Sequence, residues 1–161
     1  MLDVLTRPNY VVVMAKRQPT SVRFDETVAV RLAAFAASYP GLSLSSAANL
    51  LIDEGLRVYE HPGITFRDGA TGRRAGLVGG PDVWEVVRAV RSARVAEPVL
   101  GEDALLGVVR DGTGLSTRLL RTALRYWAAY PDEIDAEIAA ADEAELAAER
   151  AWQREQELFA R

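Results

Sequence analysis

The pattern of apolar and polar positions first becomes regular at residues 18–24, with the sequence QPTSVRF. Apolar and polar side chains alternate there, and a period of two predicts a half-buried β-strand. One face of this strand carries Thr20, Val22 and Phe24, and the other carries Pro19, Ser21 and Arg23. The strand is too short to form a sheet by itself, so it needs a partner strand.

Two helices are predicted directly after this strand. Asp25 stands at the expected N-cap of the first helix, where its carboxylate can accept hydrogen bonds from free backbone N–H groups. Pro40 and Gly41 end that helix, and Ser43 is the predicted N-cap of a second helix that extends to about Val58. The apolar residues of the first helix recur at helical spacing, at Val28, Leu32, Phe35 and Tyr39.

The second helix is apolar over most of its circumference. These apolar residues are Leu44, Ala47, Ala48, Leu50, Leu51, Ile52 and Leu56. A narrower polar stripe consists of Ser46, Asn49, Asp53 and Arg57. So wide an apolar surface in so small a unit predicts burial against another surface.

The rest of the chain predicts a hairpin and further helices. Residues 59–63 are interpreted as a linker, followed by a β-hairpin whose strands are Ile64–Arg67 and Arg73–Val78. Pro81 is suited to the first turn of a helix. Further helices are predicted at about 102–110, at about 115–129 and, after Pro131, from Asp132 to near the C-terminus.

The predicted strand has no partner nearby in sequence, because two helices follow it at once. The simplest solution is the same strand of a second chain, antiparallel across a two-fold axis. The core of such a dimer would consist of Val22, Phe24, Leu32, Phe35 and Leu51. The other face of the two-stranded ribbon would present Ser21 and Arg23 twice.

Composition excludes several kinds of active site. The 161 residues include no cysteine, so thiolate chemistry, disulfides and sulfur-bound zinc are excluded. His61 is the single histidine and is interpreted as a linker residue. The stretch GATGRRAG is rich in glycine but lacks the Lys-Ser/Thr of a phosphate-binding loop. We therefore expect no enzyme, no catalytic residue, no cofactor and no metal site.

The N-terminal region does not have the pattern of a signal peptide, because Asp3 lies in its head and its apolar stretch YVVVMA is short. No apolar run approaches the ~20 residues that span a membrane. We expect a cytoplasmic protein in which residues 1–16 are a disordered leader. Whether translation starts at Met1 or Met14 stays open.

Residues 17–58 resemble the ribbon-helix-helix family of small bacterial repressors and antitoxins. The segments PTSVRFDETVAVRLAAFA and GLSLSSAANLLIDEGLR, with the spacing between them, carry the resemblance. It implies a dimer whose ribbon enters the major groove of DNA, with Ser21 and Arg23 reading base edges. Pro19 occupies the first reading position and has no side-chain donor, which departs from the family pattern. The backbone N–H groups of Ser43, Leu44 and Ser45 would bind phosphate.

Residues 61–138 resemble, more loosely, a helical domain family of antitoxin-like proteins that are often encoded beside PIN-like nuclease toxins. The resemblance rests on HPGITFRDGATGRRAGLVGGPDVWEVVRAV and DALLGVVRDGTGLSTRLLRTALRYWAAYPDEID. The second segment also has helix-turn-helix proportions. Arg118, Arg121 and Arg125 would share one helix face, which is either a DNA contact or an ordinary solvated face.

The C-terminal residues 132–161 are strongly acidic and carry a thin apolar stripe. From Pro131 onward the chain has 10 acidic and 3 basic side chains, a net charge of −7. The whole chain has a net charge of −4, so the residues before Pro131 carry a net charge of +3. This segment is either a solvated helix or one that folds onto a partner. If it binds a toxin, the expected contact residues are Ile138, Arg150, Trp152, Arg154 and Phe159.

Together these features predict a mainly α-helical chain: a ribbon-helix-helix dimer (17–58), a linker (59–63), a helical domain with a hairpin (64–131) and an acidic tail (132–161). The expected function is that of an antitoxin that binds operator DNA as a homodimer and neutralises a protein toxin, with a PIN-like nuclease as the suspected partner. The alternative is a transcriptional repressor without a toxin, whose second domain binds DNA or a small ligand.

Overall fold

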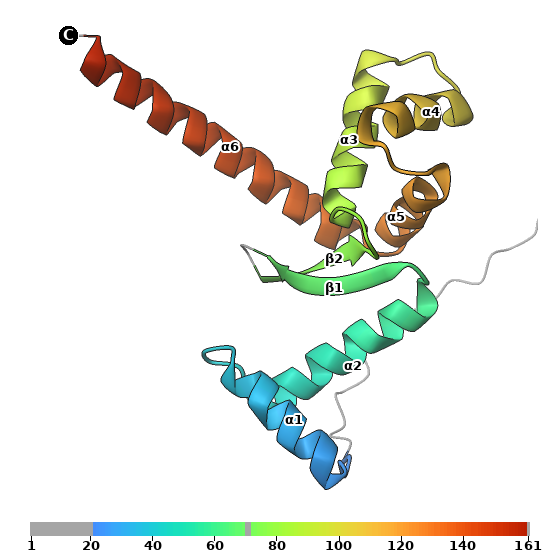
Figure 1. Ribbon diagram of the computed structural model, residues 1–161, viewed down its shortest axis with the longest axis vertical. Coiled ribbons are helices and arrows are strands. Elements are labelled where there is room, and N and C mark those ends of the chain that lie inside the picture. Colours follow the sequence, from blue (N-terminus) through green and yellow to red (C-terminus); the bar gives the residue numbers. More distant parts are fainter. Residues whose placement is uncertain (1–20, 70–71, 161) are drawn as a thin grey trace, which may run out of the picture. The chain divides into compact units, whose positions relative to one another are not determined.

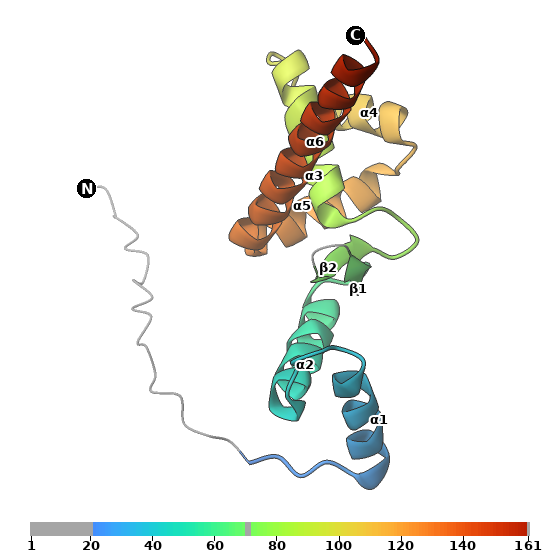
Figure 2. The same ribbon diagram turned by 90° about the vertical axis from the view of Figure 1, so that its left-hand side faces the viewer.

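A computed structural model describes residues 21–69 and 72–160 of the chain (Figures 1 and 2). The described part is mainly helical, with six helices and one two-stranded antiparallel sheet. Its contacts form two compact units, one ending at Ala47 and the other beginning at Ala48. The chain was expected to divide at a linker over residues 59–63, but the division lies inside the second helix.

The first unit contains helix α1, Glu26–Ala37, and the start of helix α2, Leu44–Glu60. Asp25 is the N-cap of α1 as predicted, but its carboxylate makes no hydrogen bond to the helix, so that part of the prediction is wrong. Ser43 does cap α2, because its hydroxyl oxygen accepts the backbone N–H of Ser46 at 3.1 Å. Both helices therefore begin where the sequence pattern places them.

Residues 21–25, which precede α1, have no regular secondary structure in the single chain. The remainder of the predicted strand, with Pro19 and Thr20, and the predicted leader over residues 1–16 lie outside the described residues. An intermolecular strand requires the second chain, so the ribbon stays a prediction.

The second unit begins with the predicted hairpin. Strand β1, Ile64–Gly69, pairs with β2, Gly72–Leu77, and Ile64 lies opposite Leu77. Gly72 has a φ of 118°, a left-handed conformation that side chains with a Cβ rarely adopt. The hairpin is confirmed, with its second strand ending one residue earlier than expected.

Four helices complete the second unit: α3 (Val83–Ala96), α4 (Glu102–Thr113), α5 (Thr117–Ala129) and α6 (Pro131–Phe159). They share a hydrophobic core with the hairpin. The core consists of Ile64, Ala75, Leu77, Val83, Val86, Val87, Leu106, Val109, Leu120, Ala123, Tyr126, Ile134 and Ile138. Every element from β1 to α6 contributes to it, so the hairpin and the four helices form one folded body.

Local signals explain where these helices begin. Asp82 and Glu85 form a capping box at α3, so Pro81 lies before the helix and not in its first turn as predicted. Gly114, with a φ of 73°, ends α4. Ser116 caps α5, accepting the backbone N–H of Leu119 at 3.3 Å.

The predicted linker is part of this folded structure. Helix α2 continues to Glu60, and the backbone N–H of His61 donates to the carbonyl of Arg57 at 2.8 Å. The His61 ring meets the edges of Tyr126 and Tyr130, with ring centroids 5.3 and 5.7 Å away. The segment is therefore held against α5 and is not a free connection.

Candidate nucleic-acid and protein interfaces

The segment before α1 carries the predicted DNA-reading residues. Ser21, Val22 and Arg23 are exposed in the single chain, and Phe24 is half-buried. Val22 leaves 60% of its surface exposed, which is unfavourable for an apolar side chain that has nothing to cover it. The segment therefore exposes both polar and apolar side chains in the single chain.

The N-terminus of α2 has the features of an anion-binding helix end. Ser43, Leu44 and Ser45 are all exposed, and the first turn of the helix contains no acidic side chain. Backbone N–H groups and the positive end of the helix dipole attract anions at such a position. Because the cap is a serine, it satisfies the N–H of Ser46 without adding negative charge.

One side of α2 exposes a row of large apolar residues, here called the α2 stripe. Its members are Leu44, Ile52, Leu56 and Tyr59. Spacings of eight, four and three residues place them on one side of the helix. Tyr59 is 84% exposed and the other three are about half exposed. Of the apolar surface predicted for this helix, Leu44, Ile52 and Leu56 are therefore uncovered in the single chain, whereas Ala47 is buried and Ala48, Leu50 and Leu51 are half-buried.

The other predicted dimer-core residues differ in their burial. Leu32 is buried in the single chain. Phe35 is half-buried and its ring contacts Tyr39 at a centroid distance of 4.8 Å. Leu51 is also half-buried. The α2 stripe and Val22, with Val28 and Val30 of α1, therefore present exposed apolar side chains that a second chain would newly cover.

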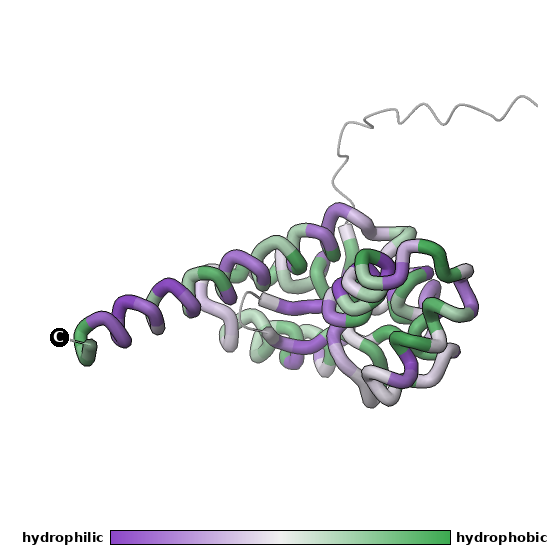
Figure 3. Tube along the Cα trace, turned by 90° about the horizontal axis from the view of Figure 1, so that it is seen from above, coloured by the Kyte–Doolittle hydropathy of each residue, from purple (hydrophilic) through white to green (hydrophobic). Residues whose placement is uncertain are grey.

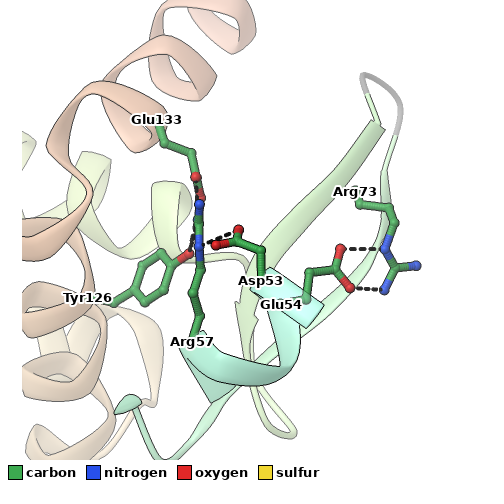
Figure 4. A network of polar contacts seen from close by, with 6 residues as sticks. All are labelled: Asp53, Glu54, Arg57, Arg73, Tyr126 and Glu133. Carbon is green, nitrogen blue, oxygen red and sulfur yellow. Dashed lines mark hydrogen bonds and ion pairs between the residues drawn. The ribbon is translucent and has the colours of Figure 1, made fainter. Parts of the chain in front are cut away.

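Within the second unit, ion pairs join the polar side of α2 to the other elements of that unit (Figure 4). The guanidinium of Arg57 donates to Glu133 at 2.5 Å and to the Tyr126 hydroxyl at 3.0 Å, and it pairs with Asp53 at 2.8 Å. It also lies 4.2 Å from the ring centroid of Tyr130. One cation on α2 thus holds groups from α5, α6 and the turn between them.

A second pair strengthens this attachment. Arg73 on β2 donates two hydrogen bonds to Glu54, at 2.6 and 2.8 Å. Glu54 is buried, and the paired geometry compensates for the loss of its hydration. The sequence pattern indicated Asp53 and Arg57 as polar positions, but it identified neither Glu54 nor the partners on β2, α5 and α6.

The electrostatics of this network favour a structural role over proton transfer. Burial opposes the charge on Arg57, but hydrogen bonds to Glu133 and Tyr126 outweigh it and raise its pKa. Burial likewise raises the pKa of the Tyr126 hydroxyl above its usual range. At neutral pH Arg57 therefore stays protonated and charged, and the Tyr126 hydroxyl stays protonated and neutral. Neither group is suited to act as a general acid or base, and their hydrogen bonds hold α2 against α5 and α6.

Helix α6 is divided into a packed half and an exposed half (Figure 1). Ile134 and Ile138 lie in the core, and Arg88 on α3 pairs with Asp142 and Glu145. From Asp142 to Ala160 every residue is exposed. Figure 1 shows this part of α6 extending away from α3, α4 and α5.

Ile138 was expected to contact a toxin, and this prediction is wrong. The side chain is only 7% exposed and belongs to the hydrophobic core. The remaining predicted contacts, Trp152, Phe159, Arg150 and Arg154, are all exposed. Trp152 leaves 59% of its surface uncovered and Phe159 leaves 78%.

The three arginines of α5 do not form one free basic face. Arg121 is paired with Glu102 and Asp103, at 2.7 and 2.8 Å. Arg118 and Arg125 are exposed, and Arg125 donates to the Thr122 hydroxyl at 3.2 Å. The arginine at the centre of the predicted row is therefore neutralised within the chain.

Among residues 21–69 and 72–160, no group of three or more His, Asp or Glu side chains is arranged to hold a metal ion. Over the same residues, no helix combines the length and the apolar character needed to cross a membrane. Comparisons with protein-family models, curated proteins and solved structures found no match to this chain. Its function is therefore inferred from its own residues and contacts.

Proposed function

We propose that this chain is the antitoxin of a type II toxin–antitoxin pair. Its N-terminal region would dimerise and bind operator DNA, and the exposed half of α6 would bind and neutralise a protein toxin, with a PIN-like ribonuclease as the candidate. The observation that carries the proposal is the division of α6, in which a helix anchored in the core continues as an uncovered amphipathic segment.

Dimerisation is supported by the apolar surface that the single chain leaves open. A second copy would cover Val22 and the α2 stripe, which are exposed, and would supply the missing partner for the strand. The ribbon would then place Ser21 and Arg23 of both copies in the major groove. An arginine at such a position can donate two hydrogen bonds to the O6 and N7 atoms of guanine.

Phosphate binding at the start of α2 would orient the dimer on DNA. The exposed N-terminus at Ser43, Leu44 and Ser45 lacks acidic neighbours in its first turn, so it would not repel the phosphate backbone. Contacts of this kind set the position of a protein on DNA, whereas the ribbon side chains would supply the sequence preference.

Toxin binding is supported by the chemistry of the exposed half of α6. Figure 3 shows hydrophilic and hydrophobic segments alternating along α6 toward its C-terminal end. Ala141, Ala148, Trp152 and Phe159 continue the face that Ile134 and Ile138 begin. Amphipathic helices of this type bind by laying the apolar face into a groove of a partner.

The charge of this segment specifies the partner further. Residues 142–159 contain six acidic and two basic side chains. The acidic residues would face the basic RNA-binding surface of a nuclease, while Arg150 or Arg154 would enter its carboxylate-rich metal site. The same net charge disfavours pairing of the segment with its own copy.

Co-expression with the product of a neighbouring reading frame tests the proposal. A chain ending at Leu146 retains Asp142 and Glu145, the partners of Arg88, and therefore keeps the packed half of α6 anchored. We expect this truncated chain to remain folded but to lose toxin neutralisation and co-purification. Full neutralisation by the truncated chain would exclude the tail as the toxin-binding segment.

A substitution pair controls for the loss of helix length. The double variant Trp152→Ala/Phe159→Ala should lose neutralisation, because it removes the two exposed aromatic anchors. The matched variant Gln153→Ala/Gln156→Ala changes polar residues of the same segment and should neutralise as well as the wild type. Equal activity of both variants would contradict the assignment of Trp152 and Phe159.

A further inference from the structure

An apolar cavity of about 480 Å³ is lined by residues of α3, α4 and α5. We infer that this cavity binds a small molecule with an apolar body and one anionic group. The inference goes beyond the proposed function, because neither DNA binding nor toxin binding uses these residues.

The walls of the cavity favour an apolar ligand. Val87 and Val90 come from α3, Leu105 from α4, and Leu124 and Trp127 from α5. The volume falls within the range of about 300–1,000 Å³ that is usual for small-molecule sites. Trp127 is held in place, because its indole N–H donates to Asp135 at 2.9 Å, so one wall is a fixed aromatic surface.

Three charged side chains line the cavity, and two of them are paired with an opposite charge within the chain. Arg91 pairs with Asp135 at 2.7 Å and lies 5.4 Å from the Trp127 ring centroid. Glu102 pairs with Arg121 at 2.7 Å. Neither side chain therefore contributes a net charge to a bound ligand.

Arg94 is the third charged side chain that lines the cavity, and within residues 21–69 and 72–160 it forms no salt bridge. Its guanidinium donates to the backbone carbonyls of Leu100 at 2.6 Å and of Pro98 at 3.3 Å. These bonds fix the orientation of the guanidinium but leave its positive charge uncompensated. An anionic group on the ligand would supply the missing counter-charge, whereas a cationic ligand would be repelled.

Fluorescence titration of the full chain with two dyes tests the inference. Anilinonaphthalene sulfonate has an apolar aromatic body and an anionic group, and phenylnaphthylamine has nearly the same body without the charge. We expect both to bind the wild type. The variant Val90→Phe narrows the cavity and should weaken both at least about tenfold, since the lost space is apolar contact area.

The variant Arg94→Met separates the anionic contact from the apolar one. It should lower the affinity for anilinonaphthalene sulfonate about tenfold, because the sulfonate group loses its contact with the guanidinium. The affinity for phenylnaphthylamine, which has no anionic group, should change less than about twofold. Arg110→Met on the exposed surface of α4 is the matched control for the loss of an arginine. Trp152→Ala is the control for dye bound to the exposed half of α6. Arg110→Met and Trp152→Ala should each bind both dyes with the affinity of the wild type.

Three results would overturn the inference. They are that neither dye binds the wild type, that Val90→Phe binds both dyes with unchanged affinity, or that Arg94→Met loses the same affinity for both dyes. Sedimentation of the wild type and of Val90→Phe adds a further arm. Dissociation of an oligomer by Val90→Phe would assign the cavity to a second copy of the chain and would also contradict the small-molecule site.

Discussion

The guanidinium of Arg57 in α2 lies 2.5 Å from a carboxylate oxygen of Glu133 in the first turn of α6. This contact joins the helix assigned to dimerisation directly to the helix assigned to toxin binding. The Arg57 side chain is only 18% exposed, so water reaches the ion pair poorly and its loss is costly. Within the second unit, this cation therefore links the C-terminal part of α2 to α5 and α6.

Replacing Arg57 by methionine should therefore lower the free energy of unfolding of the full chain by about 2–3 kcal/mol, because Glu133 and Asp53 would lose a buried partner. Urea denaturation followed by circular dichroism measures this. The exposed pair of Arg110 with Asp111 provides a control, and Arg110→Met should cost less than about 0.5 kcal/mol. Equal losses in the two variants would show that the Arg57 network adds nothing beyond a surface pair.

Glu137 on α6 predicts a dependence of stability on pH. Burial, with the nearby charge of Glu133, raises the pKa of its carboxyl to about 7, and one of its oxygens is buried without a hydrogen-bond partner among the described residues. Because the folded-state pKa exceeds the unfolded one, the favourable contribution is complete below about pH 4.5 and is lost as the pH rises through about 7.

The variant Glu137→Gln removes this titration. It should match the wild type at pH 4.5 and be more stable by about 1–2 kcal/mol at pH 8, since the partly hydrated carboxylate no longer has to be charged. Urea denaturation at the two pH values gives the comparison. Glu143→Gln, at an exposed position of α6, should show the same pH dependence as the wild type, and identical behaviour of both variants would refute the role of Glu137.

Arg23 is the side chain on which sequence-specific DNA binding is expected to depend. Arg23→Ala should weaken binding to operator DNA by about 1–3 kcal/mol for each bidentate guanine contact removed, while the protein stays folded and dimeric. A gel shift with DNA from the chain's own upstream region measures this. Arg31→Ala, at an exposed position of α1, is the matched control. Unchanged affinity in Arg23→Ala would remove this residue from the interface.

The α2 stripe is expected to hold two copies of the chain together. Ile52→Glu and Leu56→Glu place a charge where a second copy would bury apolar surface, and each should convert the dimer to a monomer at micromolar concentration. Both residues are about half exposed in the single chain, so neither substitution should unfold it. Val108→Glu changes a comparably exposed valine on α4 and should leave the sedimentation of the dimer unaltered.

Local signals in the sequence predicted the elements of the fold well. Ser43 was predicted to cap α2 and does so, and a helix was predicted after Pro131, which begins α6, because a capping hydroxyl or a proline acts within a few residues of its own position. The hairpin follows in the same way from a glycine-containing turn between two short extended segments. These features need no information about distant parts of the chain.

The contacts between distant segments could not be predicted from the same signals. Arg57 was assigned to a polar stripe, but nothing in its neighbourhood identifies Glu133 and Tyr126 as partners. Ile138 has the spacing of an exposed anchor and of a core residue equally, because an apolar stripe does not show where a neighbouring helix ends. Only the position of α3 against the first half of α6 decides between the two.

The straightness and length of α6 set the distance at which a toxin would be held. At a rise of 1.5 Å per residue, its 29 residues span about 43 Å, and Trp152 stands about 21 Å along the axis beyond Ile138. A toxin bound at Trp152 would therefore sit beyond the part of α6 that packs against α3. Any bulky addition at the C-terminus, such as a fused fluorescent domain, would compete for that space and should be avoided in assays of neutralisation.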